Sequence, residues 1–270
     1  MRTRFWAAAA AIVVLAAANS ALALVMAPNP PARRAIGADV VVVGKISSIQ
    51  SDLVQAEPFP GAKQKSGYRV ATVTIKEGLA GVGKIKEIKV GYIPPPKPNP
   101  NQPGRPGIRP IRGPLPALEL KEGQELIFFL AKHPTTDFYV IPGMMPPVEL
   151  KDEQGKKELE VVKKVTATLA DPMKGLKSDK AETRAETAAI VISKYRSFPP
   201  SGGNTTEVAI NADESKLLLK ALLEGDWSNR GFRFDGPPSA LMAFQSLALS
   251  DKDGWVQPII VNAPGTPPID

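Results

Sequence analysis

The 270-residue sequence contains no cysteine and a single histidine, His133. Without cysteine there can be no disulfides, thiolate nucleophiles, zinc fingers or iron–sulfur sites, and one histidine cannot supply a two-histidine metal site. Aromatic residues make up only 6% of the chain, so few side chains are available for stacking on nucleic-acid bases. No motif indicates a reaction, and we expect a non-enzymatic protein without a cofactor or a metal.

The apolar run at residues 7–18 is too short to cross a bilayer alone. Its 12 residues would span about 18 Å as a helix, against a bilayer core of about 30 Å. Two arginines precede the run and the small-residue sequence Ala21-Leu22-Ala23 follows it, which is typical of a secretory signal peptide. We therefore expect a signal peptide at residues 1–23 and an exported bacterial envelope protein, periplasmic or extracellular. An uncleaved anchor is the alternative, and otherwise we expect only transient membrane contact through this segment.

Residues 38–148 show the alternating and β-branched patterns of strands. The predicted strands are 38–46, 68–75, 85–93, 126–130 and 137–141. The fourth of them is apolar at every position, as in a strand that is buried on both faces. Five strands in about 110 residues indicate a small antiparallel β-barrel or sandwich. An extended segment at residues 24–37 is expected to precede it.

This order of strands resembles the netrin-like OB-fold module, which includes the N-terminal domain of tissue inhibitors of metalloproteinases. The resemblance rests on the sequences ADVVVVGK (38–45), EGLAG (77–81) and GQELIFFL (123–130). It implies a barrel that serves as an extracellular binding module. Those inhibitors chelate the protease zinc through an amino-terminal cysteine. Because this sequence has no cysteine, the resemblance implies no inhibitory chemistry.

Proline is abundant, and ten of its 28 copies lie in residues 94–116 with four cations and no acid. The cations are Lys97, Arg105, Arg109 and Arg112. Because proline disrupts helices and central strands, this insertion between the third and fourth strands must be extended or irregular. One hypothesis is a basic arm that binds an anionic envelope polymer. The alternative is a passive connection, since long insertions cost little free energy.

From Asp152 onward the apolar spacing changes to the helical period of 3.6 residues. The first predicted helix ends at Asp171-Pro172, and a capping box of Asp179 and Glu182 begins the second. A third helix begins after the capping box of Asn211 and Glu214, and a fourth begins at Pro238. We therefore predict an α+β fold, with an OB-type barrel at 38–148, a helical domain at 152–255 and a flexible tail at 256–270.

Four features resemble chemical sites, but each favours a structural interpretation. The segment Gly78–Lys84 has phosphate-loop spacing without the hydroxyl residue that follows such a loop, and is predicted to be a glycine turn. Residues 251–254 have too few acids for a calcium loop. His133 is expected to be an exposed turn residue, and Trp227 and Trp255 are expected to pack against helices rather than stack on sugars.

We predict an exported binding or interaction protein that binds an unknown protein or an anionic envelope polymer. One alternative is nucleic-acid or anionic-polysaccharide binding through the OB face and the proline-rich loop, which the net charge of +7 favours. Export and the low aromatic content disfavour nucleic acid. The other alternative is an enzyme that uses carboxylates such as Glu119, Glu122 or Asp137.

If residues 94–116 bind an anionic polymer, replacing Lys97, Arg105, Arg109 and Arg112 together by serine should weaken retention on a heparin column. Exposed cations would dominate the contact, and salt screens such charges over about 8 Å at physiological ionic strength. The variant should elute at lower salt with an unchanged melting temperature. Elution at the same salt concentration would leave the segment as a passive connection.

Overall fold

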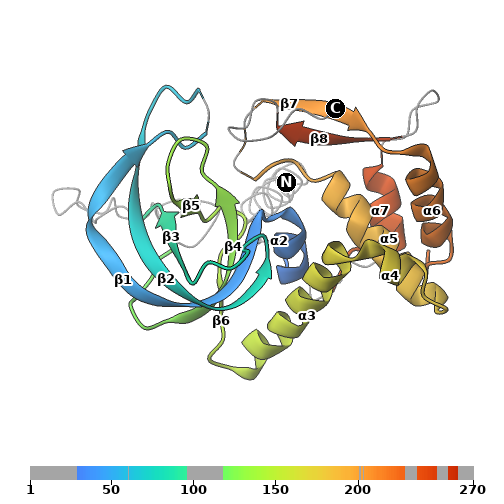
Figure 1. The fold of residues 1–270 in the computed structure, drawn as a ribbon, viewed down its shortest axis with the longest axis horizontal. Helices are drawn as coiled ribbons and strands as arrows, with labels where there is room; N and C mark the ends of the chain where they lie inside the picture. Colours follow the sequence, from blue (N-terminus) through green and yellow to red (C-terminus); the bar gives the residue numbers. More distant parts are fainter. Residues whose placement is uncertain are drawn as a thin grey trace, which may run out of the picture. The chain divides into compact units, whose positions relative to one another are not determined.

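The computed structural model describes residues 29–59, 61–95, 118–200, 202, 204–228, 236–247 and 255–260. These residues form a six-stranded sheet, a two-stranded sheet and six helices (Figure 1). The fold is therefore α+β, as the sequence predicts.

The larger sheet has the strand order β1-β2-β3-β5-β4-β6, and a further pairing joins β1 to β4. Its pairings are antiparallel except for the parallel pair β3–β5. Because β1 pairs with both β2 and β4, the pairings of the first five strands run in the order β1-β2-β3-β5-β4 and then back to β1. The strands are β1 (Val40–Ala56), β2 (Ser66–Ala80), β3 (Glu87–Tyr92), β4 (Glu125–Lys132), β5 (Tyr139–Val140) and β6 (Val148–Glu149).

Strand β1, with 17 residues, pairs with β2 along one edge and with β4 along the other. Its first part, Val40 to Lys45, pairs with β4, and four register shifts interrupt its pairing with β2. Such irregularities bend a strand and increase its twist. A Cβ on Gly44 would lie 2.4 Å from Cγ1 of Val73, so only glycine allows β1 and β2 to approach this closely.

Strand β4 is buried on both faces, as its continuous apolar sequence predicts. Leu126, Phe128 and Leu130 belong to a cluster formed by the strands and the segment before β4. Ile127 and Phe129 belong to a second cluster that also contains residues of the helices. The strand is therefore the layer between two cores.

Helix α2 (Pro31–Gly37) occupies a segment that the sequence interpretation treats as extended. That prediction is wrong for residues 31–37, because proline is well suited to the first turn of a helix and Pro31 stands at this position. Ala32, Ala35 and Ile36 of the helix are buried in the cluster that contains Phe129.

The remaining helices are α3 (Glu153–Ala170), α4 (Pro172–Leu176), α5 (Ala181–Tyr195), α6 (Ala212–Leu223) and α7 (Ala240–Ser246). The predicted cap Asn211 is confirmed, since its side chain accepts hydrogen bonds from two backbone N–H groups of α6. The predicted box of Asp179 and Glu182 is wrong, because α5 begins after Lys180 and has no side-chain cap. Helix α7 begins two residues later than predicted, with Ser239 as its cap.

A two-stranded sheet joins β7 (Thr205–Ala209) to β8 (Val256–Ile260). The prediction of a flexible tail is therefore wrong for residues 256–260, while residues 261–270 lie outside the described residues. Sequence patterns miss this strand because its partner lies far away in the chain and Pro258 is unusual in a strand.

One hydrophobic cluster contains residues of both the sheet and the helices. It includes Val43 of β1, Phe129 of β4, Ala35 of α2, Val162 of α3 and Ile190 of α5. The sequence interpretation gives each half a core of its own, with a boundary near residues 143–155, and this division stays a prediction. Because residues of both halves share this cluster, we expect each half to contribute to the stability of the other.

The single histidine, predicted to be exposed, is buried. His133 has an exposed fraction of 2%, and its ring lies 5.6 Å from that of Tyr68 and 5.2 Å from that of Phe138, between centroids. Its Nδ1 accepts a hydrogen bond of 3.3 Å from the backbone N–H of Thr135. Burial lowers the pKa of His133, and the carbonyl and the charge of Glu57 oppose this shift.

We expect Phe129→Leu to lower the stability of the helices as well as the sheet, by about 1–2 kcal/mol. Trp227 and Trp255 both follow α6 in sequence and pack with helix residues, so the tryptophan fluorescence of a chain that begins at residue 24, and so lacks Trp6, reports on the helical half. Its thermal midpoint should fall together with the circular dichroism midpoint. An unchanged fluorescence midpoint with a lowered sheet signal would establish two independent cores.

We expect the free energy of unfolding to fall as the pH drops below about 6.5, because the unfolded chain then protonates a histidine that the folded chain holds neutral. The folded pKa lies below the unfolded one, so this stability is complete above the unfolded value and is lost on acidification. His133→Phe keeps an aromatic ring beside Tyr68 and Phe138 but cannot titrate. Denaturant titrations at about pH 7 and pH 5 should show a smaller pH effect in this variant, and an equal effect would contradict the assignment.

Candidate ligand pocket

Two helices place charged and apolar side chains on facing sides of one pocket. Val161, Lys164 and Val165 of α3 line it, and residues at this spacing share one face of a helix. Helix α5 contributes Glu182, Ala185 and Glu186 with the same spacing. Helix α3 is fixed at its start by the side chain of Asp152, which accepts a 2.8 Å hydrogen bond from the backbone N–H of Gly155.

A third wall comes from the end of α6 and the segment that leads into α7. It consists of residues 224–226 and 236–240. A Cβ on Gly225 would lie 2.7 Å from Cβ of Ala240 and 3.2 Å from Cβ of Ala185. Glycine at this position therefore lets the turn after α6 approach both helices.

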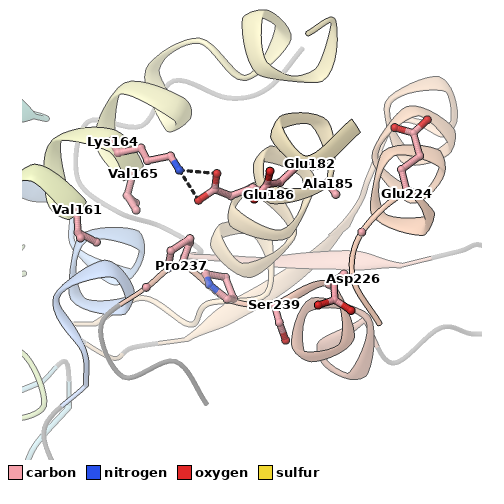
Figure 2. A pocket seen from close by; sticks show the side chains of 14 residues that line it. Val161, Lys164, Val165, Glu182, Ala185, Glu186, Glu224, Asp226, Pro237 and Ser239 are labelled. Atoms are coloured by element: carbon pink, nitrogen blue, oxygen red, sulfur yellow. Dashed lines mark hydrogen bonds and ion pairs between the residues drawn. The ribbon is translucent and has the colours of Figure 1, made fainter. Parts of the chain in front are cut away.

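The pocket has a volume of about 800 Å³, which is within the usual range for small-molecule sites. Its lining is part polar and part apolar, and the apolar part includes the buried side chains of Val165, Ala185 and Ala240. Figure 2 shows the polar side chains that surround this lining, with Glu182 and Glu186 on α5 and Glu224 and Asp226 after α6.

Ion pairs connect the walls of the pocket. Lys164 donates to both carboxylate oxygens of Glu186, at 2.7 and 2.5 Å (Figure 2). Arg184 Nε donates to Glu224 at 2.6 Å. Glu182 has no ion pair within the described part of the chain and is exposed. Within the described residues, Glu186 and Glu224 are therefore each paired with a cation.

Asp226 has a local structural role at the end of α6. Its carboxylate accepts hydrogen bonds from the backbone N–H of Ser228, at 2.9 Å, and from the Ser228 hydroxyl, at 2.6 Å. These bonds hold the turn at the edge of the pocket. Glu182 is thus the carboxylate of the pocket with the greatest freedom to pair with a bound cation.

Three buried or partly buried side chains with shifted pKa values, Tyr195, Arg34 and Lys194, lie outside the lining of the pocket. Tyr195 Oη donates to Glu214 at 2.6 Å, and burial together with this hydrogen bond raises the pKa of Tyr195 to about 12. Burial lowers the pKa values of Arg34 and Lys194. None of these side chains lines the pocket.

The cations proposed from sequence, Lys97, Arg105, Arg109 and Arg112, lie outside the described residues, and so does the segment 251–254. Their role as an anion-binding arm stays a prediction.

The three carboxylates considered for catalysis each have a different setting. Glu122 accepts a 3.0 Å hydrogen bond from the backbone N–H of Ile49, and Asp137 pairs with Lys89 at 2.6 Å. The hydrogen bond from Lys89 lowers the pKa of Asp137. Glu119 is exposed just before β4. None of the three lines the helical pocket.

The structural interpretations of the loop and of the tryptophans are confirmed. Gly81 and Gly83 have φ angles of 71° and 63° in the turn that follows β2, as expected of a glycine turn. Trp255 is buried and donates a 2.8 Å hydrogen bond to Ser215, while Trp227 contacts the ring of Phe244 edge-on.

A second hollow of about 440 Å³ lies over strands β1, β2 and β3. Its lining includes Gln50, Val70 and Lys89 from the strands and residues 135–138 from the turn before β5. Asp137 in this turn is one of the three carboxylates considered for catalysis, but neither pocket is predicted from the sequence. For the helical pocket, the sequence contains only the equal spacing of Val161-Lys164-Val165 and of Glu182-Ala185-Glu186. That these two helix faces lie opposite each other depends on the tertiary structure.

Within the described ranges, no group of three or more histidine or acidic side chains is arranged to hold a metal ion. The helices of the same ranges include none with the length and hydropathy needed to cross a membrane. Neither a protein-family model nor a curated protein matches the sequence.

Proposed function

We propose that the chain is an exported, non-enzymatic binding protein whose helical pocket binds a cationic group attached to an apolar body, such as a lysine or arginine side chain of a partner protein. The observation that carries this proposal is the pocket of about 800 Å³, whose wall combines apolar side chains with the exposed carboxylate of Glu182. Apolar contact would supply affinity, and the exposed carboxylate of Glu182 would select a cation.

The arrangement of charges supports ligand binding more than catalysis. Glu186 is paired with Lys164, and Glu224 is paired with Arg184. The first pair links α3 to α5, and the second links α5 to the turn after α6. Both pairs thereby help to fix the shape of the pocket. Exposed Glu182 is then available for a ligand, and a bound cation would not have to displace an existing partner.

The five strands β1 to β5 are proposed to form an OB-type barrel of the netrin-like kind. The return of the pairing from β4 to β1 supports this proposal, as do the bent β1 and the parallel pair β3–β5. In this view the barrel is the scaffold, and the signal peptide at residues 1–23 directs the chain to the cell envelope.

A second candidate function is anion binding at the hollow over β1, β2 and β3. The observation in its favour is Lys89, whose ammonium group lies beside the hollow together with the hydroxyl residues Thr135 and Thr136. Oxygen-rich ligands suit such groups. A bound anion would have to compete with Asp137 for Lys89, because these two side chains form an ion pair. For this reason anion binding is the second candidate.

The pocket proposal predicts that a short peptide with a central lysine between leucines binds more tightly than the same peptide with a central glutamate. Glu182→Gln should weaken binding of the lysine peptide about threefold or more, because it removes one charge partner. Val161→Trp should weaken both peptides by filling the pocket. Isothermal titration at low and at physiological salt measures these affinities.

Glu153→Gln is the matched control, since Glu153 is an exposed acid at the start of α3 outside the pocket. This variant should bind the lysine peptide as the parent chain does. Equal affinity for the two peptides, or equal loss in the Glu153 and Glu182 variants, would contradict the proposal.

A further inference from the structure

The two edges of the β7–β8 sheet differ in what they offer to another strand. The antiparallel register pairs Val208 with Gln257 and Glu207 with Pro258. Just before β8, the backbone N–H of Ile210 donates to the carbonyl of Trp255 at 3.3 Å. Residues 210 and 255 are therefore a hydrogen-bonded pair of this ladder.

Hydrogen-bonded and non-hydrogen-bonded pairs alternate along an antiparallel ladder. Counting from Ile210 and Trp255, Val208 and Gln257 form the next bonded pair, and Glu207 and Pro258 are a non-bonded pair. The backbone N–H and C=O groups of Glu207 consequently point away from β8. The same holds for Thr205 and Ala209, which have the same phase along β7.

Pro258 closes the outer edge of β8 to strand addition. At its position the backbone N–H would point outward, and proline has none, so an added strand would find no donor at the middle of β8. Natural sheets protect exposed edges in this manner. Strand β7 has no proline, and within the described residues no strand pairs with its outer edge.

The side chains on the outer edge of β7 identify the partner. Thr205, Glu207 and Ala209 are exposed, whereas Val208 is half-buried on the opposite face. A second copy of β7, paired antiparallel in the register that uses all three outward residues, would place Glu207 opposite Glu207. Like charges in directly opposite positions destabilise a sheet. A strand with a basic residue opposite Glu207 would avoid this conflict.

We propose that β7 binds an extended peptide segment of a partner protein by strand addition, with a lysine or arginine opposite Glu207 and apolar residues on either side of it. The apolar neighbours would lie on the face that carries Val208, because successive side chains of a strand alternate between faces. This inference is independent of the helical pocket, none of whose lining residues belongs to β7.

The probe is a fluorescein-labelled peptide, Thr-Val-Lys-Val-Thr, with blocked ends. Its binding should protect the amide protons of Thr205, Glu207 and Ala209 from hydrogen exchange. Glu207→Pro should weaken binding about tenfold or more, since it removes an outward donor but no hydrogen bond to β8. Glu207→Gln keeps the donor and should weaken binding about threefold through the lost charge pair.

Asp213→Asn is the matched control, because Asp213 is an exposed acid on α6 and should leave peptide affinity unchanged. Tryptophan fluorescence melting of each variant reports on folding near Trp255. Equal affinity of the parent chain and Glu207→Pro, or protection of amides other than the three outward ones, would overturn the proposal. A dimer of the parent chain that Glu207→Pro dissociates would overturn it in favour of a second copy.

Discussion

The buried guanidinium of Arg34 holds the sheet and the helices around α2. Arg34 is only 8% exposed, donates to the carbonyl oxygens of Asn29 and Pro146, and lies 5.5 Å from the ring centroid of Phe129. Burial lowers its pKa, while the charge of Glu158 opposes the shift. Burying an unpaired charge is costly unless hydrogen bonds and an aromatic face replace water. Both are present, so the position of α2 is tightly constrained.

Lys194 is a second buried cation that joins the helices to the sheet. Its ammonium group on α5 donates to the carbonyl oxygen of Ala38 at 3.1 Å, and burial lowers its pKa while Asp39 opposes this. The carboxylate of Asp39 in turn accepts a 3.0 Å hydrogen bond from the backbone N–H of Lys132. The link between α2 and β1 is thus connected to α5 and to β4 at once. Helix α5 is a wall of the pocket, so the sheet helps to fix the geometry of that wall.

Local sequence patterns were sufficient to predict those helices and strands in which the spacing of apolar residues matches the side chains that are buried. The alternation in β2 and β3, the continuous apolar run of β4 and the cap at Asn211 each gave a correct element. The pairing of β7 with β8 and the burial of His133 depend on residues distant in the chain, and no local period encodes them. The helical pocket also depends on residues distant in the chain. The need for glycine at position 225 arises only because Ala185 and Ala240 lie against it in the folded chain.

The distribution of charge separates the proposed binding surfaces by the ligands they could select. Four cations and no acids lie in residues 94–116, against a net charge of +7 for the whole chain. The helical pocket has the exposed carboxylate of Glu182 in its wall, and Glu207 is the charged residue of β7. Charges at an exposed site add little free energy in water, so they serve mainly to discriminate between ligands. Affinity must therefore come from what lies next to them, the apolar lining beside Glu182 and the open backbone edge beside Glu207.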